Sequence, residues 1–276
     1  MIIDAHQHFW QFDPVRDAWI TEEMQTIRKD FLPEDLKPVL EKNGVDGCVA
    51  VQADQSETET DFLLQLANEN DFIKGVVGWA DLRGADIKSR LEHYSKFPLL
   101  KGFRHIVQGE PDKNFLLRDD FGNGIKALAE YDFTYDILVY PHQLPAVGEF
   151  VKKFHEQPLV IDHLAKPDFE TGELKSWEQH IRNIARYKNV YCKLSGMVTE
   201  ADLQNWEYED FVPFLEVALE AFGPDRLMFG SDWPVCLLAA EYEEVIGIVR
   251  QFVGKLSASE QTQIMGGNAA EFYKLK

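Results

Sequence analysis

The chain has 276 residues, enough for two ordinary domains, although an α/β barrel of this length forms one domain. Its 47 acidic and 28 basic residues give a formal net charge of −19 at pH 7, and the acidic residues are spread along the whole chain. This charge argues against nucleic acid and anionic membrane surfaces as partners, because both are bound through clusters of Lys and Arg.

The cysteines and the N-terminus indicate the cellular compartment. Cys48, Cys192 and Cys236 are far apart and form no CxxC pair, and the first two lie in apolar, strand-like runs. This favours reduced core thiols over a disulfide. No basic region followed by an apolar stretch opens the chain, and no apolar run approaches the ~20 residues of a membrane-spanning helix. We therefore expect a complete, cytoplasmic protein.

Short apolar runs alternate with amphipathic segments throughout the chain. Eight runs are strand-like and end in polar residues: 1–8, 47–52, 73–81, 100–106, 133–140, 158–165, 189–196 and 226–232. Helices are predicted between them, for example over 59–70, 123–132, 145–156, 176–187 and 211–223, where apolar residues recur at spacings of three and four. Near-continuous apolar strands that alternate with such helices indicate a parallel sheet.

Eight strand-helix units predict a (β/α)8 TIM barrel, distorted or regular, that forms a single domain over residues 1–276. No linker or internal repeat divides the chain. A doubly wound open sheet is the alternative fold. Its dinucleotide-binding form has no support, because no G-x-G-x-x-G motif follows an early strand, and we expect no organic cofactor.

The first run ends in the sequence DAHQH. In an extended chain, Asp4, His6 and His8 point to the same face. Two imidazoles at positions i and i+2 suit a metal ion or the polarisation of one carbonyl oxygen, whereas a lone histidine at a strand end is more often structural. Asp4 either orients an imidazole or caps the strand.

The segment after this run, residues 10–40, is longer than an ordinary loop and carries several aromatic residues. A long loop between the first strand and its helix usually forms part of the substrate mouth of a barrel.

Barrel active sites lie at the carboxyl ends of the strands, so the polar residues there are candidates. After the first strand, they are Gln52, Trp79, Asp81, Arg104, His105, Asp136, Tyr140, Asp162, His163, Lys193, Ser195, Ser231 and Asp232. Arg104 offers a fork for a carbonyl or carboxylate oxygen, although an ordinary ion pair would also explain it. His163 stands where a third imidazole is expected. Asp232 can serve as a base or ligand, or alternatively as a helix cap or Asx turn before Pro234.

Several other residues allow two interpretations of their orientation or role. Lys193 needs a partner if it is buried, and its alternation allows either the barrel lumen or the helix layer. His105 has the opposite parity to Arg104, so one of the two faces outward unless a bulge intervenes. Trp10, Trp79 and Trp233 are either platforms for the face of a sugar ring or plain packing.

Taken together, DAHQHFW, GFRH, VIDHLAKP, VYCKLSG and MFGSDWPV resemble the amidohydrolase superfamily. The closest resemblance, over the whole chain, is to the branch that contains L-fuconolactonase, L-rhamnonolactonase and 2-pyrone-4,6-dicarboxylate hydrolase. It implies hydrolysis of a lactone, with Asp232 activating water and His6, His8 and His163 around the lactone carbonyl.

The resemblance also bears on metal content. Binuclear members carry a bridging Lys or Glu on strand 4 and a His on strand 5, whereas this chain has GFRH and YDILVY there. Two metals are therefore not expected. One divalent ion of the zinc type, held by His6, His8 and Asp232 with or without His163, and catalysis without a metal both stay open.

We expect Asp232 to take a proton from water while the histidines, Arg104 or a metal stabilise the oxyanion, at about 3 to 4 kcal/mol for each donor. The three tryptophans and the lack of a basic cluster favour a neutral sugar lactone over a dicarboxylate. A decarboxylase or C–N amidohydrolase would use the same residues, whereas a non-catalytic binding barrel would not need them together. The expected partner is a small-molecule lactone, and a homo-oligomer is compatible with the sequence.

Overall fold

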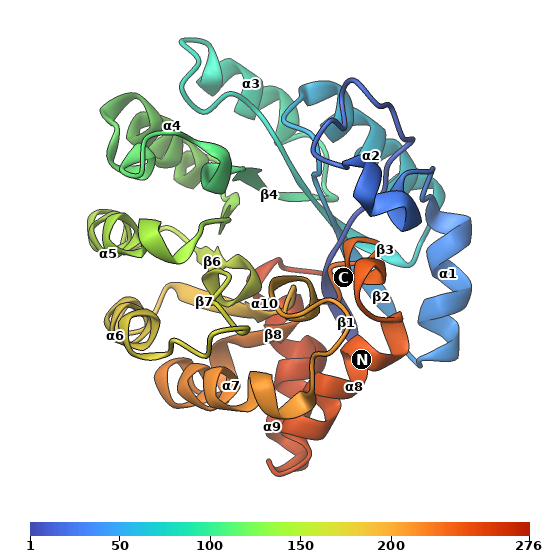
Figure 1. Cartoon of the computed structure of the whole chain (residues 1–276). Coiled ribbons are helices and arrows are strands. Elements are labelled where there is room, and N and C mark those ends of the chain that lie inside the picture. Colours follow the sequence, from blue (N-terminus) through green and yellow to red (C-terminus); the bar gives the residue numbers. More distant parts are fainter.

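The computed structural model describes residues 1–276 and contains one sheet of eight parallel strands, each paired with the next in chain order. Figure 1 shows the strands inside a ring of helices, with the chain running once around the ring. The strands are β1 (Ile3–Gln7), β2 (Gly47–Val51), β3 (Ile73–Gly78), β4 (Leu100–His105), β5 (Thr134–Ile137), β6 (Leu159–Ile161), β7 (Val190–Leu194) and β8 (Leu227–Phe229). The predicted (β/α)8 barrel is confirmed.

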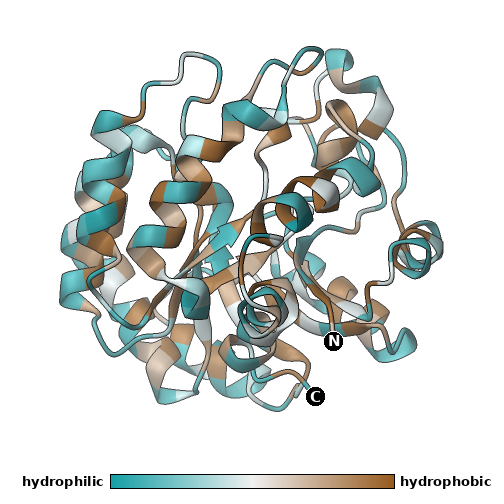
Figure 2. Ribbon diagram, turned by 90° about the horizontal axis from the view of Figure 1, so that it is seen from below, coloured by the Kyte–Doolittle hydropathy of each residue, from teal (hydrophilic) through white to brown (hydrophobic).

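The helices pack their apolar faces on the strands. They are α1 (Pro33–Lys42), α2 (Glu57–Glu69), α3 (Ile87–Tyr94), α4 (Asp119–Glu130), α5 (Leu144–Lys153), α6 (Lys175–Ile184), α7 (Tyr208–Phe222), α8 (Tyr242–Val253), α9 (Ala258–Thr262) and α10 (Asn268–Phe272). In α4, for example, the i, i+4, i+7 residues Phe121, Ile125 and Leu128 are all buried. Figure 2 shows the same alternation as brown and teal patches along the outer helices.

The barrel closes where β8 meets β1, just beyond the ends of both strands. The N–H of His8 donates to the carbonyl of Trp233 over 2.7 Å, and the N–H of Asp232 donates to the carbonyl of His6 over 2.8 Å. Asp4 reinforces this seam, because its carboxylate accepts hydrogen bonds from the Ser231 hydroxyl and from the Ser231 N–H. Asp4 thus ties the seam together and accepts the backbone N–H of His6, not an imidazole N–H.

The two ends of the barrel interior differ in polarity. At the end opposite the strand carboxyl termini, residues of the C-terminal segment join the inward-facing strand residues in one apolar cluster: Ile3, Ala5, Val49, Val51, Val77, Val160, Met228, Ala269, Phe272 and Tyr273. At the other end, the inward-facing side chains are mostly polar and charged. The C-terminal segment therefore plugs one end, and the opening lies at the other.

Strand positions match the predicted runs, but the strands end earlier than the runs do. His8, Asp81, Tyr140, His163, Ser195 and Asp232 all follow the last residue of their strands. The long segment 10–40 contains a loop, a short 3-10 stretch and α1, and its loop residue Trp19 reaches the opening described below. The three cysteines are buried and unpaired. None of the helices combines the length and apolarity that crossing a bilayer requires.

Candidate active site

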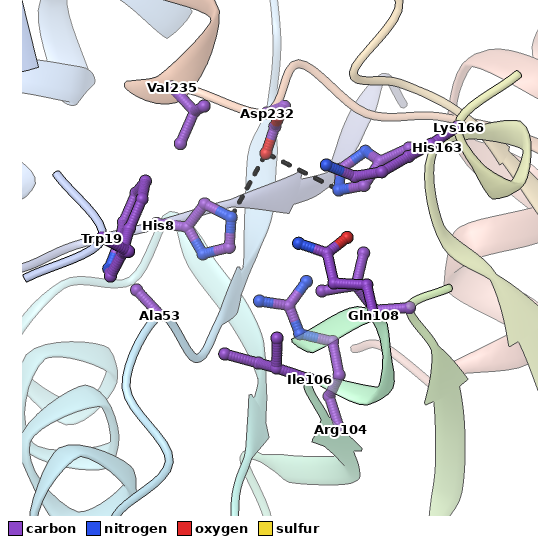
Figure 3. A pocket seen from close by; sticks show the side chains of 11 residues that line it. His8, Trp19, Ala53, Arg104, Ile106, Gln108, His163, Lys166, Asp232 and Val235 are labelled. Atoms are coloured by element: carbon purple, nitrogen blue, oxygen red, sulfur yellow. Dashed lines mark hydrogen bonds and ion pairs between the residues drawn. The ribbon is translucent and has the colours of Figure 1, made fainter. Parts of the chain in front are cut away.

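A cavity of about 200 Å³ opens at the carboxyl ends of the strands (Figure 3). Its lining comes from strand ends and from the loops that follow them: His8, Trp19, Ala53, Arg104, Ile106, Gln108, Leu138, His163, Lys166, Asp232 and Val235. The predicted residues His8, Arg104, His163 and Asp232 therefore meet at one cavity, and His6 lies directly beneath them. Four segments far apart in the sequence converge as the barrel prediction required.

His6 and His8 project from β1 toward the cavity, with 3.2 Å between their Nε2 atoms. The Nδ1 atom of His8 lies 2.7 Å from the carbonyl oxygen of Val51, which can only accept a hydrogen bond. The proton of the neutral His8 ring is therefore on Nδ1, and the Nε2 lone pair faces the cavity. Burial lowers the pKa of His6 well below its ordinary value, with the nearby Lys193 ammonium acting in the same direction.

Asp232 stands at a turn with a φ of +60°, which directs its carboxylate at the imidazoles. Its Oδ1 atom lies 3.2 Å from Nε2 of His8, 3.7 Å from Nε2 of His6 and 3.8 Å from Nε2 of His163. Burial alone would raise the pKa of Asp232, but the three imidazoles outweigh it and hold the pKa below the ordinary range of an Asp. The group is therefore a carboxylate at neutral pH.

His163 opens a left-handed turn of four residues, 163–166, whose φ angles lie between +52° and +60°. Such a conformation costs non-glycine residues energy, and it persists only where neighbours enforce it. The indole N–H of Trp177 donates to the carbonyl of Leu164 over 2.7 Å, and Oγ of Ser195 lies 2.9 Å from Nδ1 of His163. Burial lowers the pKa of His163 to about 4, so its ring is neutral at pH 7.

The donor set fits one tetrahedral metal ion. Nε2 of His6, Nε2 of His8 and Oδ1 of Asp232 are buried and close enough to share an ion, with Nε2 of His163 nearby. The separations among the atoms of His6, His8 and Asp232, 3.2 to 3.7 Å, bracket the roughly 3.4 Å between ligands of a tetrahedral zinc with bonds of about 2.0–2.1 Å. The Val51 carbonyl gives His8 the outer hydrogen bond that ligating histidines usually have.

Below the imidazoles lies a buried network of charges. Nη1 of Arg104 donates to Oδ2 of Asp162 over 3.0 Å, and the same guanidinium donates to the backbone carbonyl of Gln52. Nζ of Lys193 lies 2.6 Å from Oδ2 of Asp136 and 2.9 Å from Oδ1 of Asp162. Lys193 therefore faces the barrel lumen, which resolves the question left open by its alternation.

The two carboxyls of this network differ in their pKa. Burial raises the pKa of Asp136 to about 6, against the attraction of Lys193. Burial also disfavours ionisation of Asp162, but Lys193, His6 and Arg104 outweigh it and hold its pKa well below the ordinary value. Asp162 is thus the fixed negative charge beneath His6.

Other predicted substrate contacts lie outside the cavity lining. His105 packs flat on Phe115 and bonds to Glu110 over 2.7 Å, because its parity turns it away from Arg104. Trp79 is beside His105, with 3.5 Å from its Nε1 to Nδ1 of that ring. Lys193 contacts His6 from below and does not line the cavity.

The tryptophans near the mouth mainly pack on other rings. Trp233 is buried against Phe9 and Phe31, and Trp10 is buried with its indole N–H bonded to the carbonyl of Lys29. Trp19, which the sequence analysis did not single out, is the tryptophan that lines the cavity. Its signal was its place in the long aromatic segment 10–40.

Two polar lining residues were also missed. Figure 3 shows the amide of Gln108 directed into the space between Arg104 and His163, and its Oε1 is buried without a hydrogen-bond partner. Lys166 ends the left-handed turn and pairs with Glu200 over 2.6 Å. Both residues lie in loops after a strand, where spacing gives no signal. Only the family resemblance of the sequence VIDHLAKP drew attention to the segment that contains Lys166.

Known proteins resemble this chain over its whole length. The family model described as amidohydrolase matches residues 3–275. An L-fucono-1,5-lactonase from Burkholderia multivorans is 41% identical, over 99% of this chain and 96% of the relative. An L-fucono-1,5-lactonase from Burkholderia ambifaria is 34% identical, over 99% and 95%. A crystal structure of an amidohydrolase from Burkholderia multivorans with bound zinc is 40% identical, with a TM-score of 0.97 and 100% of both chains covered.

Proposed function

The chain belongs to the amidohydrolase family, and we propose that it hydrolyses a neutral sugar lactone of the L-fucono-1,5-lactone type. The observation that carries this proposal is the convergence of the Asp232 carboxylate with three imidazoles at one small cavity. A carboxylate base beside a set of fixed donors suits attack of water on an acyl carbon. The names of the two lactonase relatives supply the substrate class.

We propose that His6, His8 and Asp232, with His163, hold one divalent ion of the zinc type. The donor spacing described above supports this, as does the zinc in the structure from Burkholderia multivorans. When bound, such an ion polarises the lactone carbonyl and lowers the pKa of a water molecule. A set of one carboxylate and several imidazoles is a suitable ligand set for a divalent cation.

We propose the following steps for hydrolysis of the lactone. Asp232 accepts a proton from water as the water oxygen bonds to the carbonyl carbon. The bond from that carbon to the ring oxygen then breaks, and Asp232 returns its proton to the departing alkoxide. The product is an open-chain hydroxy acid, which ionises and releases one proton to the solvent.

The cationic residues of the cavity indicate that the substrate is neutral. Arg104 and Lys166 are the cationic lining residues, and each already has an anionic partner, Asp162 and Glu200 respectively. No unpaired cation is therefore left to neutralise a substrate carboxylate. Trp19, Ile106 and Leu138 give the cavity an apolar side that suits the C–H face of a sugar lactone.

The test is a set of initial rates measured with a pH indicator, because lactone opening releases acid. Fucono-, rhamnono-, galactono- and gluconolactones are compared with 2-pyrone-4,6-dicarboxylate, before and after chelation and after addition of zinc. We expect turnover of one or more sugar lactones and none of the dicarboxylate. Turnover of the dicarboxylate alone would overturn the assignment of a neutral substrate. Full activity with no bound metal would refute the proposed role of a metal ion.

A further inference from the structure

Lys193 is a wholly buried lysine whose three nearest acceptors lie on three different strands or strand ends. Its side chain has no exposure to solvent. Nζ lies 2.6 Å from Oδ2 of Asp136, 2.9 Å from Oδ1 of Asp162 and 3.1 Å from Nδ1 of His6. An ammonium group has three N–H donors and no lone pair. Its hydrogen-bond acceptors are Oδ2 of Asp136 and Nδ1 of His6, and Asp162 is paired with it by charge.

The neighbours on the other side of the His6 ring agree with this arrangement. When the ring of His8 is neutral, its one proton is on Nδ1 and its Nε2 can only accept. The 3.2 Å contact between the two Nε2 atoms is then a hydrogen bond only if His6 carries its proton on Nε2. Two contacts favour the other tautomer: Nη1 of Arg104 lies 3.3 Å from Nε2 of His6, and Oδ1 of Asp162 lies 3.3 Å from Nδ1 of His6. Both are longer than the contacts of His6 with Lys193 and His8, and Nη1 of Arg104 already donates to Asp162 over 3.0 Å.

We propose that Lys193 is a positioning residue that selects the tautomer of His6. In the metal-free protein it keeps the His6 proton on Nε2, so that His6 presents an N–H toward Asp232 and the cavity. A divalent ion needs the Nε2 lone pair. Binding therefore moves the proton to Nδ1, where Oδ1 of Asp162 lies 3.3 Å away, with no net gain or loss of protons. Lys193 then loses one of its two hydrogen-bond acceptors.

This inference rests on the proposed metal only for its second consequence. The tautomer in the metal-free protein follows from contacts within the chain, so it can be tested without any ion. The metal consequence is that Lys193 weakens binding, because the ion must displace a hydrogen bond from a charged donor. The two consequences have separate measurements, and failure of the metal proposal is distinguishable from failure of this one.

The first measurement is a long-range ¹H–¹⁵N spectrum of metal-free protein labelled with ¹⁵N-histidine. It reports which ring nitrogen carries the proton, and the His6 signals are identified by their loss in His6→Gln. The chain has eight histidines, so the spectrum stays simple. We expect the proton on Nε2 in the wild type. In Lys193→Met/Asp136→Asn, which removes one positive and one negative charge, we expect it on Nδ1.

Tyr273→Phe is the matched control. It removes a hydrogen bond of 2.7 Å to Oδ2 of Asp136 within the same network but leaves Lys193 beside His6. We expect this variant to keep the wild-type tautomer. Cooperative thermal unfolding of each variant shows that it is folded. If the wild type carries the proton on Nδ1, or if the double variant keeps it on Nε2, the role given to Lys193 is wrong.

The second measurement is calorimetric titration of the same proteins with Zn²⁺. We expect the double variant to bind Zn²⁺ about tenfold more tightly than the wild type, and Tyr273→Phe to bind it as the wild type does. Equal affinities of the wild type and the double variant would show that Lys193 does not compete with the ion for His6. Absence of binding in every protein would refute the metal proposed above, and the spectra alone would then decide the role of Lys193.

Discussion

Asp232 is the single anion among the groups that line the cavity, and its carboxylate faces three imidazoles. In Asp232→Asn the amide cannot accept a proton from water, so we expect kcat/KM on a sugar lactone to fall by about 10²–10⁴-fold. Initial rates across a range of substrate concentrations measure the loss. Asp81→Asn is the control, because this half-exposed carboxylate follows β3 but does not line the cavity. Retention of wild-type rates by Asp232→Asn would remove Asp232 from the chemistry.

Gln108 lines the cavity and has a side-chain oxygen that makes no hydrogen bond within the protein. Its Oε1 is buried and has no partner, so a substrate hydroxyl is the natural donor to it. We expect Gln108→Leu to lower kcat/KM on a sugar lactone by about tenfold, mainly through KM, as the loss of one hydrogen bond predicts. δ-Valerolactone has no hydroxyl groups, and its kcat/KM should not fall. Equal losses on both lactones would point to a disturbed cavity instead of a lost hydrogen bond.

Individual site residues differ in how far the sequence predicts them. His6, His8, His163, Arg104 and Asp232 are predictable because each stands at the end of an apolar run, and a barrel gathers such ends on one rim. The direction of Lys193 is not, because alternation assigns it to a face without saying which face is the lumen. Its partners Asp136 and Asp162 come from other strands, so only the folded barrel identifies them.

Among the elements, the left-handed turn 163–166 packs directly against Gly196. A Cβ on Gly196, whose φ is +64°, would lie 2.5 Å from Nδ1 of His163. We expect Gly196→Ala to displace the His163 ring and to lower kcat/KM by at least about tenfold, since misplacement of a catalytic group by 1 Å can cost about 10²-fold. Stability should also fall, because alanine is strained at positive φ.

Gly44→Ala separates these two effects. Gly44 has a φ of +63°, and a Cβ there would meet nothing within 4 Å. Both variants therefore carry the same backbone strain, about 1 kcal/mol, but only Gly196→Ala has the clash. Chemical denaturation and lactone hydrolysis are measured on both. If Gly44→Ala lost as much activity as Gly196→Ala, contact with His163 would not be the cause.

The strands and larger helices were predictable as elements, since near-continuous apolar runs mark the strands and apolar spacings of three and four mark the helices. Their ends were less so. The predicted run 158–165 contains only three strand residues, because the chain leaves the ladder at Asp162 to enter the left-handed turn. The polar residues that follow the strands thus line the cavity and do not extend the strand pairing. Sequence periodicity does not show where the pairing stops.

For the whole molecule, the eightfold alternation was enough to predict the barrel, but not how it closes or which end is plugged. The seam depends on Asp4 and Ser231, which are 227 residues apart in sequence. The plug is formed by α10 and the residue after it, a segment too short for a clear periodic pattern. Both features hold the imidazoles of β1 against the carboxylate that follows β8.

Buried carboxyls also give the whole molecule a predictable response to pH. Glu59 of α2 accepts hydrogen bonds from the backbone N–H groups of Ala53 and Asp54, and burial raises its pKa from 4.5 to about 8. Burial likewise raises the pKa of Asp4 and of Asp136 to about 6. These carboxyls make the folded state hold more protons than the unfolded chain. Below about pH 6.5 the lowered pKa values of His6 and His163 act in the opposite direction, so the carboxyls set the sign above that pH.

The sign of the effect follows from linkage. A raised pKa in the folded state contributes stability that is complete below the unfolded pKa and is lost as the pH rises through the folded value. We expect the free energy of unfolding to fall between pH 6.5 and pH 9, and to fall by about 2 kcal/mol less in Glu59→Gln, which cannot ionise. Urea unfolding at a series of pH values measures this. Growing negative charge also destabilises the fold as the pH rises, but the exposed Glu23→Gln removes the same charge and serves as its control. If both variants flattened the pH profile equally, net charge and not the burial of Glu59 would set the response.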